Sequence, residues 1–228
     1  MTHGFRARFR ELIQHRPLQV LTAAILVAAS AAAATPLRHG EPGEPRSLLD
    51  AAVVRAQAGA LQTPEKTLEL VWDGADVDGD GRADFANPTG QEARGHDAYG
   101  YGEFGTRRDG GARRHEGVDF VADAGQEVVA PISGFVTKIG YAYAGDQDLR
   151  FVEITNPALH RTARVFYVRP TVDVGDAVAV GRPIGRARTL QDKYPAGMTD
   201  HVHLELMDHV GRRFDAAEVL TERYASAD

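Results

Sequence analysis

The sequence predicts a mostly β protein, built around a compact antiparallel β-sheet with long glycine-rich loops and short helices near both ends. From Gly117 onward, short runs of β-prone residues recur, and each run is bounded by Gly, Pro or Asp. Hydrophobic residues make up 43% of the 228 positions, which is enough to bury a sizeable core. Tandem repeats at solenoid spacing are not found in the sequence. These observations favour a single β domain with additions before it.

The first 34 residues predict an export signal or a membrane anchor. Arginines are frequent up to residue 16, no charge occurs in 17–37, and 18–34 form an apolar, alanine-rich run. This order is typical of a signal peptide, with cleavage expected after Ala34. The alternative is an uncleaved anchor, since a span needs only ~17–25 residues. We therefore expect an exported protein, periplasmic or extracellular, that is membrane-attached only if 18–34 is retained.

Residues 35–66 predict a linker followed by a short helix. Prolines and mixed charge mark 35–47, and Ser47 can cap a helix that runs to about Leu61. Residues 67–97 predict a strand over 67–72 and then an acidic, glycine-rich loop.

The domain expected over 98–228 contains eight predicted strands and a closing helix. The strands are expected at 118–121, 127–130, 134–139, 151–155, 163–168, 177–180, 183–188 and 201–207. The helix is expected at 216–224.

Composition restricts the chemistry that the chain can perform. It has no cysteine and nine histidines, which excludes disulfides, thiolate zinc sites and a cysteine nucleophile. A metal must therefore be held by His, Asp and Glu. The net charge of −6 argues against a nucleic-acid partner.

Two histidine motifs predict a catalytic zinc site. His115 and Asp119 stand four positions apart at the start of one predicted strand. The second motif, His201-Val202-His203-Leu204-Glu205, lies in another predicted strand. Alternate residues of a strand share a face, so His201, His203 and Glu205 point the same way. Two His and one Asp can hold zinc and leave a fourth position for water.

The chain also carries an ordered set of motifs between about residues 98 and 218. They are Phe104-Gly105-x-Arg107, His115-x-Gly117-x-Asp119, Ala130-Pro131-x-x-Gly134, Val174-Gly175-Asp176-x-Val178-x-x-Gly181-x-x-Ile184-Gly185 and His201-x-His203. This set resembles the LytM/lysostaphin-type zinc endopeptidases, which cut peptide cross-links in peptidoglycan. The resemblance implies an open-barrel β core, His115, Asp119 and His203 as zinc ligands, and His201 as a catalytic histidine.

The chain departs from this family at one position. The family carries a second catalytic histidine at the end of a central strand, and this chain has no histidine there. The matching stretch is Phe166-Tyr167-Val168-Arg169-Pro170, in which Tyr167 or Arg169 could instead act as an oxyanion donor. In motif detail the chain is most similar to leukocyte cell-derived chemotaxin-like members, which also lack this histidine. The resemblance implies a zinc metalloendopeptidase acting on peptidoglycan or protein, and alternatively a catalytically impaired zinc-binding module.

A second metal site is predicted in the acidic loop. Asp76, Asp78, Asp80 and Asp84 occupy positions 1, 3, 5 and 9 of a loop with glycine at position 6. Oxygen ligands around a glycine turn suit Ca²⁺. Position 12 is Asn87 rather than the Glu of an EF-hand, so we expect a non-helical calcium loop; the alternative is a solvated acidic turn.

Overall fold

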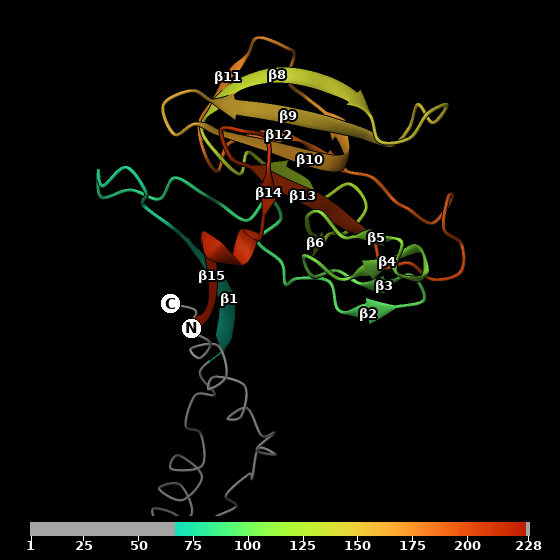
Figure 1. Cartoon of the computed structure of the whole chain (residues 1–228). Helices are drawn as coiled ribbons and strands as arrows, with labels where there is room; N and C mark the ends of the chain where they lie inside the picture. The colour runs from blue at the N-terminus through green and yellow to red at the C-terminus, as the bar shows by residue number, and fades with distance from the viewer. Residues whose placement is uncertain (1–66, 227–228) are drawn as a thin grey trace, which may run out of the picture. The chain divides into compact units, whose positions relative to one another are not determined.

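The computed structural model describes residues 67–226 and shows a nine-stranded antiparallel sheet at the centre of the fold (Figure 1). Its strands are β6 (Val118–Val121), β7 (Glu127–Val129), β8 (Gly134–Tyr141), β9 (Arg150–Asn156), β10 (Arg161–Pro170), β11 (Ala177–Val178), β12 (Pro183–Ala187), β13 (His201–Met207) and β14 (Arg213–Phe214). All eight strands predicted from the sequence are present, with shifts of a few residues at their ends. The predicted export segment, linker and first helix lie outside the described residues.

The sheet is open. Its main path runs β11-β8-β9-β10-β12-β7, while β13 attaches to β10 and carries β6 and β14. This confirms the mostly β, open architecture expected from the sequence. Among residues 67–226, no helix has the length and apolar character needed to cross a membrane.

The core lies on one face of the sheet because the strands alternate. On β9, β10 and β13 the fully buried side chains include Val152, Ile154, Ala163, Val165, Val202 and Leu204. The residues between them, including Glu153, Arg164 and Glu205, face the other side and form ion pairs there. Period-two alternation thus separates an apolar core from a polar face, and the predicted site lies on the polar face.

β10 changes its partner part-way along its length. On one edge it pairs with β13 up to Phe166 opposite His203, and then with β12 from Val168 opposite Ala187. Tyr167, between them, has a positive φ of 66° and sits at a bulge in the pairing with β9. Such a bulge redirects a side chain, and here it does so where the neighbouring strands separate.

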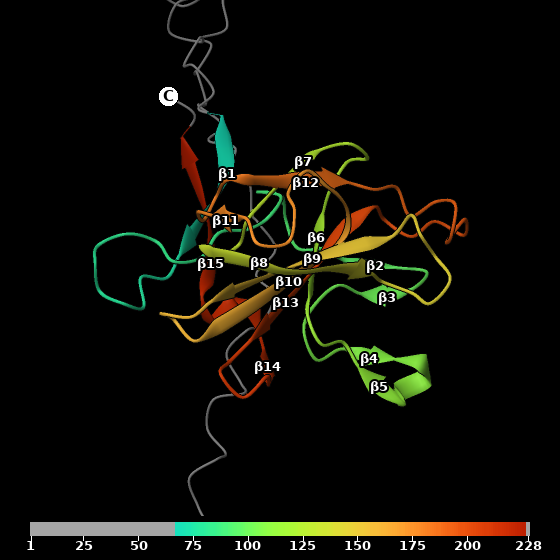
Figure 2. The same ribbon diagram turned by 90° about the horizontal axis from the view of Figure 1, so that it is seen from above.

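Smaller elements surround the sheet. β1 (Leu68–Gly74) pairs with β15 (Leu220–Ser226), β2 (His96–Asp97) with β3 (Gly100–Tyr101), and β4 (Arg107–Arg108) with β5 (Arg113–Arg114), which follows the 3-10 turn η1 (Asp109–Gly111). Figure 2 shows the two short hairpins beside the sheet.

The helix expected at 216–224 is wrong. Only a 3-10 turn, η2 (Ala216–Glu218), forms, and Asp215 caps it by accepting a hydrogen bond from the Ala217 N–H at 3.0 Å. The residues from Leu220 onward belong to β15, in which Leu220 lies opposite Gly74. Pairing with a strand nearly 150 positions earlier overrides the local helix pattern. Such long-range pairing cannot be predicted from the local sequence.

Ile154 offers a direct test of the core. Ile154→Ala should lower the free energy of unfolding by about 2–5 kcal/mol, because the side chain is fully buried and its removal leaves a cavity. Leu68→Ala is the control, since Leu68 is 59% exposed and should change stability by no more than about 0.5 kcal/mol. Urea unfolding measures both, and equal losses would contradict this description of the core.

Candidate metal centre

The pairing of β6 with β13 brings the predicted ligands together. Asp119 on β6 lies directly opposite His203 on β13. His115 stands just before β6, where its N–H donates to Thr106 O at 2.8 Å. Residues more than eighty positions apart in the sequence therefore meet at one place.

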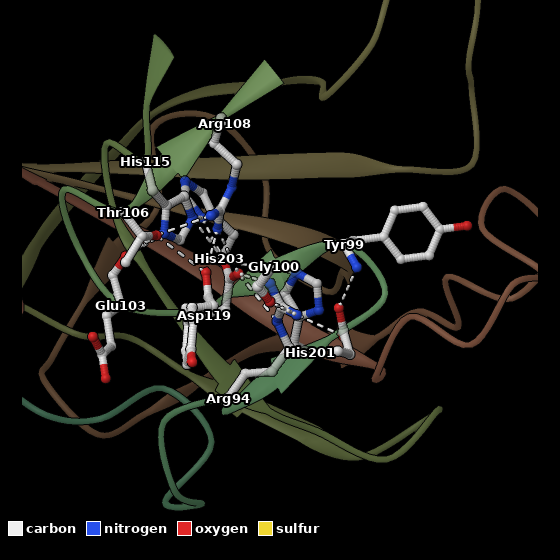
Figure 3. A network of polar contacts seen from close by, with 12 residues as sticks. Arg94, Tyr99, Gly100, Glu103, Thr106, Arg108, His115, Asp119, His201 and His203 are labelled. Atoms are coloured by element: carbon white, nitrogen blue, oxygen red, sulfur yellow. Dashed lines mark hydrogen bonds and ion pairs between the residues drawn. The ribbon is translucent and has the colours of Figure 1, made fainter. Parts of the chain in front are cut away.

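One oxygen of Asp119 is the centre of this cluster (Figure 3). Oδ1 lies 2.8 Å from His203 Nδ1 and 3.1 Å from His115 Nε2. The two histidine nitrogens are 3.0 Å apart. His115, Asp119 and His203 thus offer donor atoms close enough to bind one metal ion.

A hydrogen bond behind the ring of His115 and an ion-pair contact behind the ring of His203 orient the two histidines. His115 Nδ1 is 2.8 Å from Glu103 O, and a carbonyl oxygen only accepts, so Nδ1 carries the proton and Nε2 directs its lone pair to the point between the three side chains where a metal ion could bind. His203 Nε2 faces Glu205 Oε1 at 3.8 Å. A carboxylate behind a ligating imidazole is a common support of metal sites.

Electrostatics favour a cation at this cluster. Burial opposes ionisation of Asp119, but its contacts with His115 and His203 outweigh burial and hold its pKa well below the usual range. Burial also lowers the pKa of His203, yet Asp119 and Glu205 overcome it and raise that pKa to about 9. Without a metal, a proton on His203 provides the positive charge that the two carboxylates favour.

The residues present fit a zinc ion. Zinc with ligands at about 2.0–2.2 Å in a tetrahedron separates neighbouring donors by about 3.3 Å, close to the distances of 2.8, 3.0 and 3.1 Å found here. Gly117 leaves the space that this arrangement needs, because a Cβ there would lie 2.7 Å from His203 Cε1 and 2.3 Å from Leu204 O. Two nitrogens and one carboxylate oxygen are a donor set that zinc accepts.

His201 lies beside the cluster without belonging to it. Its Nδ1 is 2.7 Å from Thr199 O, so Nδ1 carries the proton, and its Nε2 is 3.6 Å from Asp119 Oδ1. Burial lowers the pKa of His201. The ring is therefore neutral at pH 7, with a lone pair directed at the cluster, as a general base requires.

Tyr167 also faces the cluster, because of the bulge in β10. Phe166 and Tyr167, neighbours in the chain, both line the cleft, and the Tyr167 ring lies 5.3 Å from that of His201. Its hydroxyl is 2.7 Å from Tyr143 OH, which in turn lies 2.9 Å from Tyr194 OH. Burial raises the pKa of Tyr167, so its hydroxyl stays protonated and can donate a hydrogen bond.

The structure does not bring Arg169 to the cleft. Arg169 is exposed and lies opposite Arg186, while Val168 is buried in the core. Of the stretch 166–170, only Phe166 and Tyr167 line the cleft. His160 is an exposed turn residue with a positive φ of 53° and lies along another part of the surface with His209.

The cleft above the cluster has a volume of about 350 Å³. Basic and aromatic side chains line it together with the cluster: Arg94, Arg108, Arg113, Arg114, Tyr99, Tyr143, Tyr167 and Tyr194. Sequence reasoning identified the histidines but missed Arg94, Tyr143 and Tyr194. They lie in irregular segments that carry no periodic signal.

The acidic loop gathers three of its four predicted ligands. Asp76, Asp78 and Asp84 offer oxygens close to one another, whereas Asp80 Oδ1 accepts a hydrogen bond from Arg82 N–H at 2.8 Å. Asp76 accepts from the N–H groups of Gly79 and Gly81, at 2.7 and 2.8 Å. Calcium binding here stays a prediction.

Comparison with known proteins connects this site to a family. Residues 113–216 match the family model described as Peptidase family M23. Myeloid protein 1 of Gallus gallus is 32% identical over 124 residues, which are 54% of this chain and 36% of that protein. Leukocyte cell-derived chemotaxin-2 of Mus musculus is 29% identical over 128 residues, covering 54% of this chain and 78% of that protein.

A solved structure also matches, that of the antimicrobial peptidase lysostaphin from Staphylococcus simulans. It has a TM-score of 0.43 and 19% identity, and the match covers 59% of this chain and 52% of that one. The chain spans about a third of Myeloid protein 1 and about half of the lysostaphin chain. The segment that matches the model of Peptidase family M23, residues 113–216, contains His115, Asp119, His201 and His203.

Proposed function

We propose that the protein is an exported zinc-dependent metalloendopeptidase that hydrolyses peptide bonds in peptidoglycan cross-links or in proteins. The observation that carries the proposal is the convergence of His115, Asp119 and His203 on one point, with the neutral His201 beside them. This cluster belongs to the segment that matches Peptidase family M23 and lies in an open cleft, which is a suitable place for a peptide.

The side chains around the cluster have distinct parts in such a reaction. When bound, zinc supplies Lewis-acid chemistry that activates water and polarises a carbonyl. His201 Nε2 can accept a proton in the cleft, because Nδ1 is committed to Thr199 O. Tyr167 can donate a hydrogen bond to oxygen that gains negative charge. Phe166 and Tyr167 form an aromatic wall along which an extended peptide can lie.

An alternative function follows from the identity of residue 167. Tyr167 occupies the cleft position at the end of the central strand, and its hydroxyl stays protonated, so it cannot act as a base at neutral pH. The role of base in the cleft then falls to His201, the neutral histidine beside the cluster. A zinc-binding module that recognises wall peptide or protein without cutting it is the second candidate.

The ligand assignment can be tested by zinc analysis. His203→Ala and Asp119→Ala should each weaken zinc binding by more than about a hundredfold, because loss of a ligand exceeds the 10–100-fold cost of losing an outer contact. His209→Ala, at an exposed turn, is the control and should bind zinc like the wild type. Full zinc content in either ligand variant, measured by mass spectrometry after dialysis, would refute the assignment.

Turnover and binding can be separated with purified peptidoglycan and a glycine-rich peptide. If the missing base limits the reaction, Tyr167→His should release fragments at least tenfold faster than the wild type, since His tolerates the positive φ better than most residues. Arg169→His is the matched control and should change nothing, because residue 169 does not reach the cleft. If the wild type and Tyr167→His both bind peptidoglycan without releasing fragments, the binding module is favoured.

Export is proposed from the sequence of residues 1–34 alone. Expressed in a bacterial host with its own N-terminus, the protein should appear outside the cytoplasm, and N-terminal sequencing should begin at Thr35. An intact Met1 on membrane-bound protein would indicate an anchor instead, and intact protein in the cytoplasm would contradict export.

A further inference from the structure

A buried arginine lies on the side of Asp119 away from the histidines. Arg94 is only 3% exposed, and its Nη2 and Nε lie 2.8 and 3.2 Å from Asp119 Oδ2. The two oxygens of this carboxylate therefore have separate partners, the histidines at Oδ1 and the guanidinium at Oδ2. In Figure 3 Arg94 lies below Asp119, whereas His115 lies above it.

The other end of the guanidinium leads to Asp97. Arg94 Nη1 donates to Asp97 Oδ2 and, at 3.0 Å, to Gly100 O. Asp97 also accepts hydrogen bonds from the N–H groups of Thr199, at 2.9 Å, and Tyr99, at 2.8 Å. Its carboxylate thus receives three donors, and its side chain is only 9% exposed.

Thr199 completes a chain of contacts to His201. The same residue that donates its N–H to Asp97 accepts the Nδ1–H of His201 through its carbonyl oxygen. The path runs from Asp119 through Arg94, Asp97 and Thr199 to His201. It joins a metal-ligand candidate to the histidine beside it by a route behind the cluster.

We propose that the Arg94–Asp97 pair is a positioning device that restricts Asp119 to one metal-facing oxygen and directs Nε2 of His201 toward the same point. The part that concerns the metal rests on the proposed function. Arg94 and Asp97 lie before residues 113–216, so they are additional to the segment that matches the family. Neither residue contacts the metal position, and both act through others.

The backbone holds Arg94 in place for this role. Its N–H donates to Asp119 O at 2.7 Å, and its carbonyl oxygen accepts from Gly102 N–H at 3.1 Å. A Cβ at Gly102 would lie 2.5 Å from Arg94 O, so only glycine allows this approach. The fork of an arginine can serve both carboxylates at once in fixed geometry, whereas a lysine offers one flexible ammonium.

Two conservative variants test the proposal. Arg94→Lys keeps the charge and loses the fork. Asp97→Asn keeps the shape, but its single oxygen cannot accept three donors, so at least one contact fails. Arg212→Met is the control, because Arg212 is 81% exposed and pairs with Asp208 on the surface.

The first measurement is zinc affinity by competition with a chelator. Both variants should bind zinc about 10–100-fold more weakly than the wild type, and Arg212→Met should match the wild type. Cobalt-substituted Arg94→Lys should also show a weaker visible absorption per cobalt, the signature of a second Asp119 oxygen joining the metal. Zinc affinity within threefold of wild type in both variants would overturn the proposal.

The second measurement uses metal-free protein and separates this proposal from the proposed function. Imidazole ¹⁵N spectra of the wild type should show His201 as the Nδ1–H tautomer, and Asp97→Asn should show a mixture of tautomers. A wild type with His201 as the Nε2–H tautomer would overturn the proposal even if no variant folds. If the wild type binds no zinc, the proposed function fails, and the tautomer result still decides whether the pair positions His201.

Discussion

The pairing of β6 with β13 is the constraint on which the site depends. It places Asp119 opposite His203 and, by the same register, His201 opposite Val121. A shift of one residue would turn His201 and His203 into the core and expose Val202 and Leu204, which are fully buried. Burial of these two apolar side chains therefore stabilises the fold and also fixes which residues face the metal position.

β10 contributes a second constraint, through its change of partner. Up to Phe166 it pairs with β13, and from Val168 it pairs with β12. A regular strand would send Tyr167 to the face opposite Phe166. The left-handed backbone at Tyr167 instead lets both side chains line the cleft, so an irregularity in the sheet supplies the wall beside the histidines.

The strands and the histidine cluster could be predicted from the sequence because both depend on short-range patterns. Alternation along 201–207 identifies the face of His201 and His203, and valine-rich runs between turns identify the remaining strands. The predicted helix at 216–224 failed because β15 is determined by its distant partner β1. Arg94 was missed for a similar reason, since its partner Asp119, twenty-five positions later, becomes a neighbour only after folding. The bulge at Tyr167, which brings this side chain to the cleft beside Phe166, likewise leaves no mark in the local pattern.

The hydrogen bonds among the three tyrosine hydroxyls run in one direction. Tyr194 donates to Tyr143, so the hydrogen of Tyr143 is free to point at Tyr167, and the hydrogen of Tyr167 is then free to point into the cleft. Aligned hydroxyls polarise one another, so each bond in the row strengthens the next. A ligand oxygen that accepts from Tyr167 would therefore be sensed as far away as Tyr194, in the segment that leads to Thr199 and His201.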